Sequence, residues 1–300
     1  MGLERGTGIM PLDGVEIAYT VTGSGSPVLL LHGFPQTRAM WGPVAQVLAR
    51  RHTVVTADLR GYGGSGKPGR DSPQDCTAYS FRAMGQDQFA LMSALGVERF
   101  HLVGHDRGAR VAHRMALDAG ARLASLTLMD IVPTHLLLTE LRHDVARSYF
   151  HWFFLAQPHP FPEQMITSDP DYFFESCLLG WGGAKVADFA PEHMAAYRAA
   201  WRDPAVIFGM CQDYRAALDH DLKQDAQDIG RMFDGPSLVL FGAQGAMARH
   251  FDVPATWGPW LANMQGQGIA GGHFFPDTAP DETAQALWDF LGAQDDALQA

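Results

Sequence analysis

The sequence predicts an α/β protein with a mostly parallel β-sheet and a helical insertion near the carboxyl edge of that sheet. Short apolar segments alternate with longer helical stretches, which is typical of a parallel sheet covered by helices on both faces. This rhythm stops at about residue 134 and resumes at Pro236. A chain of 300 residues, 47% hydrophobic and 18% charged, is long enough for one large domain with such an insertion.

Seven segments are candidate strands. The first, GVEIAYTVTG at 14–23, begins at an Asp13-Gly14 turn and alternates like an antiparallel edge strand. Five almost wholly apolar segments fit strands buried on both faces: SPVLLLHGF, HTVVTADLRG, FHLVGHD, LASLTLMDIV and PSLVLFGA. A weaker last strand, GQGIAGGHF, contains glycines that lower its β-propensity. Helices are expected at 40–50, 80–95, 108–119 and 281–291.

The segment from 134 to 228 is rich in aromatic residues, histidine and proline, and it predicts helices joined by loops. We therefore divide the chain into core residues 1–133, a helical cap at 134–228 inserted after the sixth strand, and core residues 229–300. A cap in this place would cover the carboxyl ends of the strands, where open α/β sheets bind their ligands.

Composition excludes several classes of partner. The net charge of −11, with lysine and arginine scattered along the chain, argues against nucleic acid. No apolar run approaches the ~18 residues of a membrane-spanning helix, and MGLERGTGIM lacks the apolar core of a signal peptide. Cys76, Cys177 and Cys211 are widely separated, which favours packed free thiols in a reducing compartment. We expect a cytoplasmic protein that binds neither nucleic acid nor membrane.

Neither of two possible cofactor-binding patterns in the sequence has the residues that it requires. GYGGSGKP is close to a phosphate-binding loop, but Pro68 stands where that loop needs a hydroxyl group, so we interpret the segment as a structural turn. The histidines show no HExxH or comparable metal-binding spacing. We expect neither a metal nor an organic cofactor.

The stretch VGHDRGAR carries the first chemical signal. It places Asp106 between Gly104 and Gly108 at a strand-to-helix junction, the layout of the G-x-S-x-G nucleophile elbow with aspartate in place of serine. A lone aspartate before a helix usually only caps it, but the two glycines and the apolar strand favour a nucleophile. A carboxylate that attacks saturated carbon forms an ester, which water can cleave, whereas serine would form a stable ether. The elbow therefore predicts substitution at sp3 carbon.

A base and an acid should complete this arrangement in the chain order nucleophile, acid, histidine. His273, in the small-residue loop AGGHFFPD after the last strand, is the candidate base. The usual position of the acid, after LVLFGA, offers Gln244 and no carboxylate before Asp252. We prefer Asp130, at the tip of the strand LASLTLMD, because a carboxylate there would be costly to bury unpaired. It would orient His273 and stabilise its protonated form.

The ester's hydrolysis creates an oxyanion that needs hydrogen-bond donors. The loop HGFP supplies the backbone N–H of Phe34, and the residue after the nucleophile supplies that of Arg107.

Two arginines follow the nucleophile. Arg107 and Arg110 are three residues apart and can share one helix face beside Asp106. Two guanidinium groups beside one carboxylate leave a surplus positive charge, which an anionic substrate would match, and arginine binds carboxylates in bidentate fashion. A structural ion-pair network is the alternative, and we favour it for Arg114. Arg107 and Arg110 thus predict a small carboxylate substrate held in line with the nucleophile.

Seven motifs together resemble the haloacetate (fluoroacetate) dehalogenases of the α/β-hydrolase superfamily: LHGFPQTRAMW, ADLRGYGGSGKP, VGHDRGAR, LMDIVPTH, FHWFFLAQPHP, CQDYRAALDHD and GGHFF. The resemblance spans core and cap. It implies an α/β-hydrolase fold, with an eight-stranded, mostly parallel sheet and a helical cap after strand 6. It also implies a hydrolytic dehalogenase that converts 2-haloacetates, fluoroacetate and chloroacetate among them, to glycolate and halide.

The resemblance assigns roles to further residues. Asp106, His273 and Asp130 would keep the roles derived above, and Arg107 and Arg110 would bind the substrate carboxylate. The departing halide would accept hydrogen bonds from the cap residues His151, Trp152 and Tyr214, whose side chains all offer N–H or O–H donors. Trp181 would gate substrate entry or simply pack there. Members of the family are commonly homodimers.

Two other functions stay open. An epoxide hydrolase shares the aspartate nucleophile but needs cap tyrosines to protonate an oxygen, for which Tyr149, Tyr172, Tyr197 and Tyr214 are available. A non-catalytic ligand-binding protein on the same scaffold would be expected to have a broken triad, whereas this sequence retains all three candidates.

Overall fold

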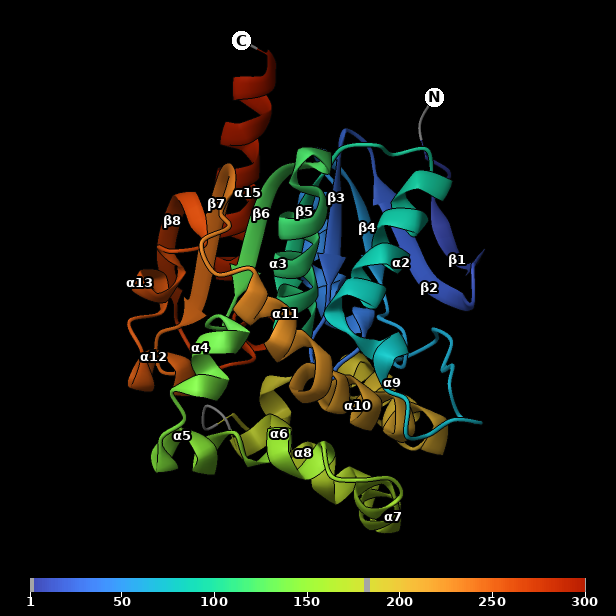
Figure 1. Ribbon diagram of the computed structural model, residues 1–300. Helices are drawn as coiled ribbons and strands as arrows, with labels where there is room; N and C mark the ends of the chain where they lie inside the picture. Colours follow the sequence, from blue (N-terminus) through green and yellow to red (C-terminus); the bar gives the residue numbers. More distant parts are fainter. Residues whose placement is uncertain (1–2, 181–183, 300) are drawn as a thin grey trace.

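The sheet predicted from the apolar segments is present. The computed structural model describes residues 3–180 and 184–299 (Figure 1). Its strands are β1 (Gly6–Leu12), β2 (Val15–Gly23), β3 (Ser26–Leu31), β4 (His52–Ala57), β5 (Phe100–His105), β6 (Leu123–Met129), β7 (Phe233–Gly242) and β8 (Leu261–Ile269). They lie in the order β1-β2-β4-β3-β5-β6-β7-β8. Only the β1–β2 and β2–β4 pairs are antiparallel, so the mostly parallel eight-stranded sheet is confirmed.

Helices cover both faces of the sheet. The core helices are α1 (Gly42–Leu48), α2 (Phe81–Ala94), α3 (Arg107–Ala119), α12 (Ala246–His250), α13 (Val253–Trp257), α14 (Phe275–Thr278) and α15 (Pro280–Gln299), with 3₁₀ turns at Arg38–Trp41, Thr77–Tyr79 and Gly120–Arg122. Helix α1 packs on α15, and α2 packs on α3; the second pair crosses in front of the sheet in Figure 1. Strands β4, β5 and β6 are buried along their whole length, which explains their unbroken apolar sequences.

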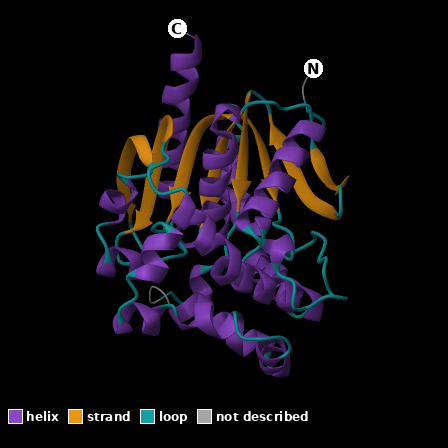
Figure 2. Cartoon of the chain, in the orientation of Figure 1, coloured by secondary structure: helices purple, strands orange, loops and turns teal. Residues whose placement is uncertain are grey.

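The chain between β6 and β7 forms helices beyond the carboxyl ends of the strands (Figures 1 and 2). They are α4 (Thr134–Thr139), α5 (His143–Ser148), α6 (Phe150–Leu155), α7 (Phe161–Ser168), α8 (Pro170–Gly180), α9 (Pro191–Trp201), α10 (Pro204–Ala216) and α11 (Leu222–Gln227), with a 3₁₀ turn at Val186–Asp188 and a π-helical turn at Ala217–Asp221. Within 134–180 and 184–228 no strand occurs. The division at 1–133, 134–228 and 229–300 stays a proposal.

The structure adds one strand to the predicted elements and corrects the bounds of two others. Strand β1 was not among the candidate segments, and it, not β2, forms the edge of the sheet. It was missed because GTGIMPL is largely exposed and pairs with β2 through its backbone, which leaves little side-chain signature. Strand β8 begins at Leu261 and ends at Ile269, before the glycines of the AGGHF loop. Helix α15 continues to Gln299 rather than ending at 291.

Candidate active site

Asp106 stands at a sharp turn between β5 and α3. Its φ of 48° lies in the region that side chains rarely adopt, as expected for the strained residue of a nucleophile elbow. A Cβ atom at Gly104 would lie 2.4 Å from the Gly108 oxygen, and one at Gly108 would lie 2.5 Å from the oxygens of Leu31 and His32. Both glycines are therefore required for the turn to close.

The Asp106 side chain does not cap the helix that follows it. No side-chain capping bond is present at α3, so the simpler interpretation of this aspartate does not apply. Its Oδ1 instead accepts a hydrogen bond from the backbone N–H of Phe34 at 2.9 Å. Although burial raises the pKa of Asp106, the charges of His273, His105, Arg107 and Arg110 lower it to about 2. The carboxylate is therefore ionised at neutral pH.

His273 lies between the two candidate carboxylates. Its Nδ1 is 2.6 Å from Asp130 Oδ2, and its Nε2 is 3.7 Å from Asp106 Oδ2. Asp130 Oδ1 accepts the backbone N–H of Gly242 at 2.8 Å. Burial lowers the pKa of His273, but the hydrogen bond and charge of Asp130 and the charge of Asp106 outweigh it and place the pKa above its ordinary value. The competing candidate, Asp252, caps α13 through Ala255 N–H and is exposed.

Three predicted halide-binding residues lie together above this site. The Tyr214 ring centroid is 5.4 Å from that of His151 and 5.3 Å from that of Trp152, and His151 stacks on Phe34 at 5.6 Å. All are buried. The Tyr214 hydroxyl has no hydrogen-bond partner within the described part of the chain. Burial lowers the pKa of His151 well below its ordinary value, so its ring is neutral.

The chain matches a family model described as "alpha/beta hydrolase fold" over residues 26–280. It belongs to the α/β hydrolases. It is 51% identical to a fluoroacetate dehalogenase from Burkholderia sp over 290 residues, which cover 97% of this chain and 94% of that protein. A soluble epoxide hydrolase from Corynebacterium sp. (strain C12) is 28% identical over 275 residues, covering 90% and 91% of the two chains.

A solved structure assigned as an alpha/beta hydrolase from Nostoc sp PCC 7120 superimposes on this hydrolase with a TM-score of 0.92. The two are 44% identical, and the match covers 95% of this chain and 97% of that one. The predicted superfamily and the resemblance to haloacetate dehalogenases are thus confirmed, and the identity to the epoxide hydrolase is much lower.

The two arginines of the hydrolase's elbow differ in their partners. Arg107 forms an ion pair with the buried Asp213, so the predicted surplus of positive charge is smaller than two guanidinium groups would give. Burial lowers the pKa of Arg107, but Asp213 outweighs it and raises the pKa. Arg110 Nη1 donates to Val132 O at 3.1 Å and Thr134 Oγ1 at 3.0 Å. Burial lowers the pKa of Arg110 to about 10, although the charge of Asp106 opposes this.

Each arginine nevertheless has one buried nitrogen whose N–H group is not used by the rest of the described chain. Arg107 Nη1 and Arg110 Nε have no hydrogen-bond partner among the described residues. The Arg110 guanidinium lies 4.8 Å from the ring centroid of Trp152, and that of Arg107 lies 4.3 Å from the ring centroid of Tyr214. The arginines therefore adjoin the same aromatic residues that were predicted to bind halide.

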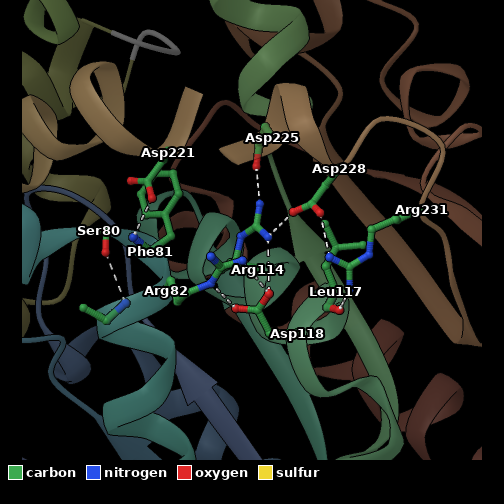
Figure 3. Close-up of polar contacts among 11 residues, drawn as sticks. Ser80, Phe81, Arg82, Arg114, Leu117, Asp118, Asp221, Asp225, Asp228 and Arg231 are labelled. Atoms are coloured by element: carbon green, nitrogen blue, oxygen red, sulfur yellow. Dashed lines mark hydrogen bonds and ion pairs between the residues drawn. The ribbon is translucent and has the colours of Figure 1, made fainter. Parts of the chain in front are cut away.

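Arg114 has the structural role that we favoured for it (Figure 3). Its Nη2 donates to Asp225 at 2.8 Å and its Nη1 pairs with Asp228. Both aspartates lie in or next to α11, at the end of the predicted cap, whereas Arg114 is on α3. The ion pairs therefore tie this helix to the helix that follows the nucleophile, with Asp118 completing the cluster at 3.4 Å.

Two residues of the site were missed by sequence reasoning. Asp213 forms an ion pair with Arg107, and the Tyr62 hydroxyl donates a hydrogen bond to Asp213 Oδ2 at 2.6 Å. Asp213 precedes Tyr214 in a motif that carries the family resemblance, and a buried arginine needs a counterion, but neither signal says which acid supplies it. Trp181, the possible gate, lies outside the described residues.

No helix in 3–180 or 184–299 has the length and apolar character needed to cross a membrane.

Proposed function

We propose that this hydrolase converts 2-haloacetates, including fluoroacetate and chloroacetate, to glycolate and halide through an ester on Asp106. The observation that carries the proposal is the position of Asp106: its side chain does not cap α3, and it lies beside two arginines that each have a buried donor without a partner among the described residues. The lowered pKa of Asp106 supports the same interpretation. The identity of 51% to a fluoroacetate dehalogenase supports the same reaction class.

In the first step, Asp106 Oδ2 attacks the carbon that bears the halogen, because Oδ1 is already held by the Phe34 N–H. The carbon–oxygen bond forms as the carbon–halogen bond breaks, and the electron pair leaves with the halide. Donors from His151, Trp152 and Tyr214 would stabilise the charge that develops on the halogen. This help matters most for fluoride, which is a poor leaving group, because donors that tighten in the transition state raise the rate.

In the second step, neutral His273 takes a proton from water, and the hydroxide adds to the carboxyl carbon of Asp106. The resulting oxyanion sits on Oδ1, within reach of the Phe34 N–H and, by our prediction, the Arg107 N–H. As this intermediate collapses, the bond between the Asp106 carboxyl carbon and the glycolate oxygen breaks, and protonated His273 gives its proton to that oxygen. The acid proton left on Asp106 passes to solvent, so glycolate is released and both the Asp106 carboxylate and neutral His273 are restored. Asp130 stabilises the protonated His273 through their 2.6 Å contact.

Arg110 would make the main contact with the substrate carboxylate. No carboxylate lies within ion-pair distance of Arg110 in the described part of the chain, whereas Arg107 and Arg114 both have aspartate partners. With Nη1 occupied, the Nε–Nη2 edge of Arg110 is the one that can receive a carboxylate in bidentate fashion. Arg107 would add one contact through Nη1.

A halide-electrode assay with fluoroacetate and chloroacetate tests this function. We expect release from the wild-type protein and none above background from Asp106→Ala. Equal release from both proteins would overturn the mechanism, and chloride release alone would remove the fluoride claim. A His273→Asn variant should accumulate the ester, seen by mass spectrometry as added mass on the peptide that contains Asp106. Its absence would count against the two-step scheme.

Epoxide hydrolysis is the second candidate, because Tyr149 and Tyr214 are buried in the cap region and could protonate an oxygen. The 28% identity to a soluble epoxide hydrolase gives it some support. Epoxide turnover without halide release would favour it over the main proposal. A non-catalytic role is disfavoured by the contacts that join Asp130, His273 and Asp106.

We also propose that the protein works in the cytoplasm as a homodimer and without a cofactor. The buried free thiols of Cys76, Cys177 and Cys211 support a reducing compartment. The dimer follows from the family resemblance, and sedimentation would test it.

A further inference from the structure

Asp213 joins three segments of the chain. It lies on α10 and is fully buried, as are Arg107 on α3 and Tyr62 in the loop after β4. Asp213 Oδ2 accepts hydrogen bonds from Arg107 Nε at 2.8 Å and from the Tyr62 hydroxyl at 2.6 Å, while Oδ1 accepts one from Arg107 Nη2. The backbone oxygen of Asp213 also accepts from Nη2, at 3.0 Å.

These hydrogen bonds leave one nitrogen of the Arg107 guanidinium, Nη1, able to donate to a ligand. A guanidinium has five N–H donors in a rigid plane, and Asp213 takes those on the Nε–Nη2 edge. Nη1 has no partner among the described residues. The guanidinium carbon also lies 4.7, 4.8 and 4.3 Å from the ring centroids of Phe81, Trp152 and Tyr214. With its plane enclosed by rings and one edge bound, Arg107 has little freedom to turn.

We propose that Asp213 is a positioning residue for substrate binding. With the support of Tyr62, it holds the Nε–Nη2 edge of Arg107, so that Nη1 is the only nitrogen of Arg107 that contacts the substrate carboxylate. This inference rests on the proposed function, because it assumes a substrate that carries a carboxylate. Asp213 itself does not touch the substrate; it acts through Arg107.

Asp213 could instead matter only because it cancels the charge of Arg107, and a substitution that keeps the charge separates the two roles. Asp213→Glu retains the carboxylate but moves it by one methylene group, which disturbs the edge-on contact. If orientation matters, this variant should bind acetate more weakly by roughly 10- to 100-fold, the value of a hydrogen bond to a charged group. If only charge matters, acetate binding should be unchanged.

Asp221→Glu is the matched control. Asp221 is also a buried carboxylate on the same proposed cap segment, but it accepts the backbone N–H of Phe81 at 3.0 Å and forms no hydrogen bond or ion pair with an arginine among the described residues (Figure 3). Enlarging either residue overpacks the interior, so both variants should lose thermal stability. Only Asp213→Glu should lose affinity for acetate.

Tyr62→Phe provides a second, milder variant. It removes one neutral hydrogen bond from Asp213 without a change of charge, so acetate should bind more weakly by roughly 3- to 10-fold. This variant decides the matter if Asp213→Glu does not fold.

The experiment measures acetate binding by calorimetry and KM and kcat for chloroacetate in the wild-type protein and the three variants. We expect Asp213→Glu and Tyr62→Phe to weaken acetate binding and raise KM more than they lower kcat, with Asp221→Glu unchanged in both. Unchanged acetate affinity in the folded Asp213 and Tyr62 variants, or an equal loss in Asp221→Glu, would overturn the proposal. Because acetate binding needs no turnover, a wild-type protein that binds acetate but releases no halide would refute the proposed function alone.

Discussion

Gly61 and Gly209 bring the loop after β4 and helix α10 into close backbone contact beside the candidate site. A Cβ atom on Gly209 of α10 would lie 2.5 Å from Gly61 Cα and 2.6 Å from Gly61 O. Nonbonded carbon atoms settle at ~3.5–4.0 Å, so Gly209→Ala must push α10 away from the loop after β4 by about 1 Å. Asp213 and Tyr214 lie about one helical turn further along α10 and would move with it.

The consequence should be visible in both activity and stability. A misplacement of about 1 Å costs on the order of 100-fold in rate, and overpacking costs about 1–3 kcal/mol of unfolding free energy. Halide release measures the rate, and urea unfolding measures the free energy of unfolding. Gly180→Ala is the control, because a Cβ at Gly180 in α8 would meet nothing within 4 Å. Wild-type activity and stability in Gly209→Ala would refute the argument that backbone contact between α10 and the core places these side chains.

Three further outcomes follow from the site. The rate of ester hydrolysis should fall as the pH drops through the raised pKa of His273, because only the neutral ring can accept a proton from water. Asp130→Asn should move this fall to lower pH, because without the Asp130 charge the burial of His273 lowers its pKa. A pH-independent rate between 5 and 9 would contradict the assigned base. Arg110→Met should raise KM for chloroacetate by roughly 100-fold or more, whereas an unchanged KM would remove Arg110 from substrate binding. Arg114→Met should cost about 3 kcal/mol of unfolding free energy, measured in urea, with KM unchanged.

Apart from β2, which its alternating pattern predicts, the strands that could be predicted with most support are those whose side chains are mostly buried on both faces. Such strands need an unbroken apolar sequence, so β3 to β6 are visible in the sequence itself. Strands β1 and β8 lie at the two edges of the sheet and are largely exposed. Their pairing depends on backbone hydrogen bonds, which any residue but proline can make, and their sequences therefore carry little information about where they begin.

The residues of the candidate site also differ in how far the sequence locates them. Asp106, Asp130 and His273 each follow a strand, and parallel strands bring their carboxyl ends to one edge of the sheet. Chain order fits Asp252 as well, so it is the position of Asp130 at a strand tip that favours it as the acid. The position of Asp213, in contrast, depends on how α10 packs against the rest of the protein. Six aspartates lie between 203 and 228, and nothing in their spacing identifies the one that faces Arg107.

The positions of these aspartates determine which arginines of α3 have an ion-pair partner. Arg107, Arg110 and Arg114 share one face of α3, since they are three and seven residues apart. Asp213 pairs with the first of them, and Asp225 and Asp228 pair with the last. A buried guanidinium without an ion-pair partner is costly. Among the described residues, Arg110 alone of the three has no carboxylate within ion-pair distance, although the charge of Asp106 offsets part of this cost. A substrate carboxylate that supplies the missing charge recovers this cost on binding, whereas an uncharged analogue of the same shape does not. If Arg110 binds the substrate as we propose, pairing Arg107 and Arg114 with aspartates while leaving Arg110 without one would favour a carboxylate substrate. Affinity for acetate over acetamide should then depend on Arg110.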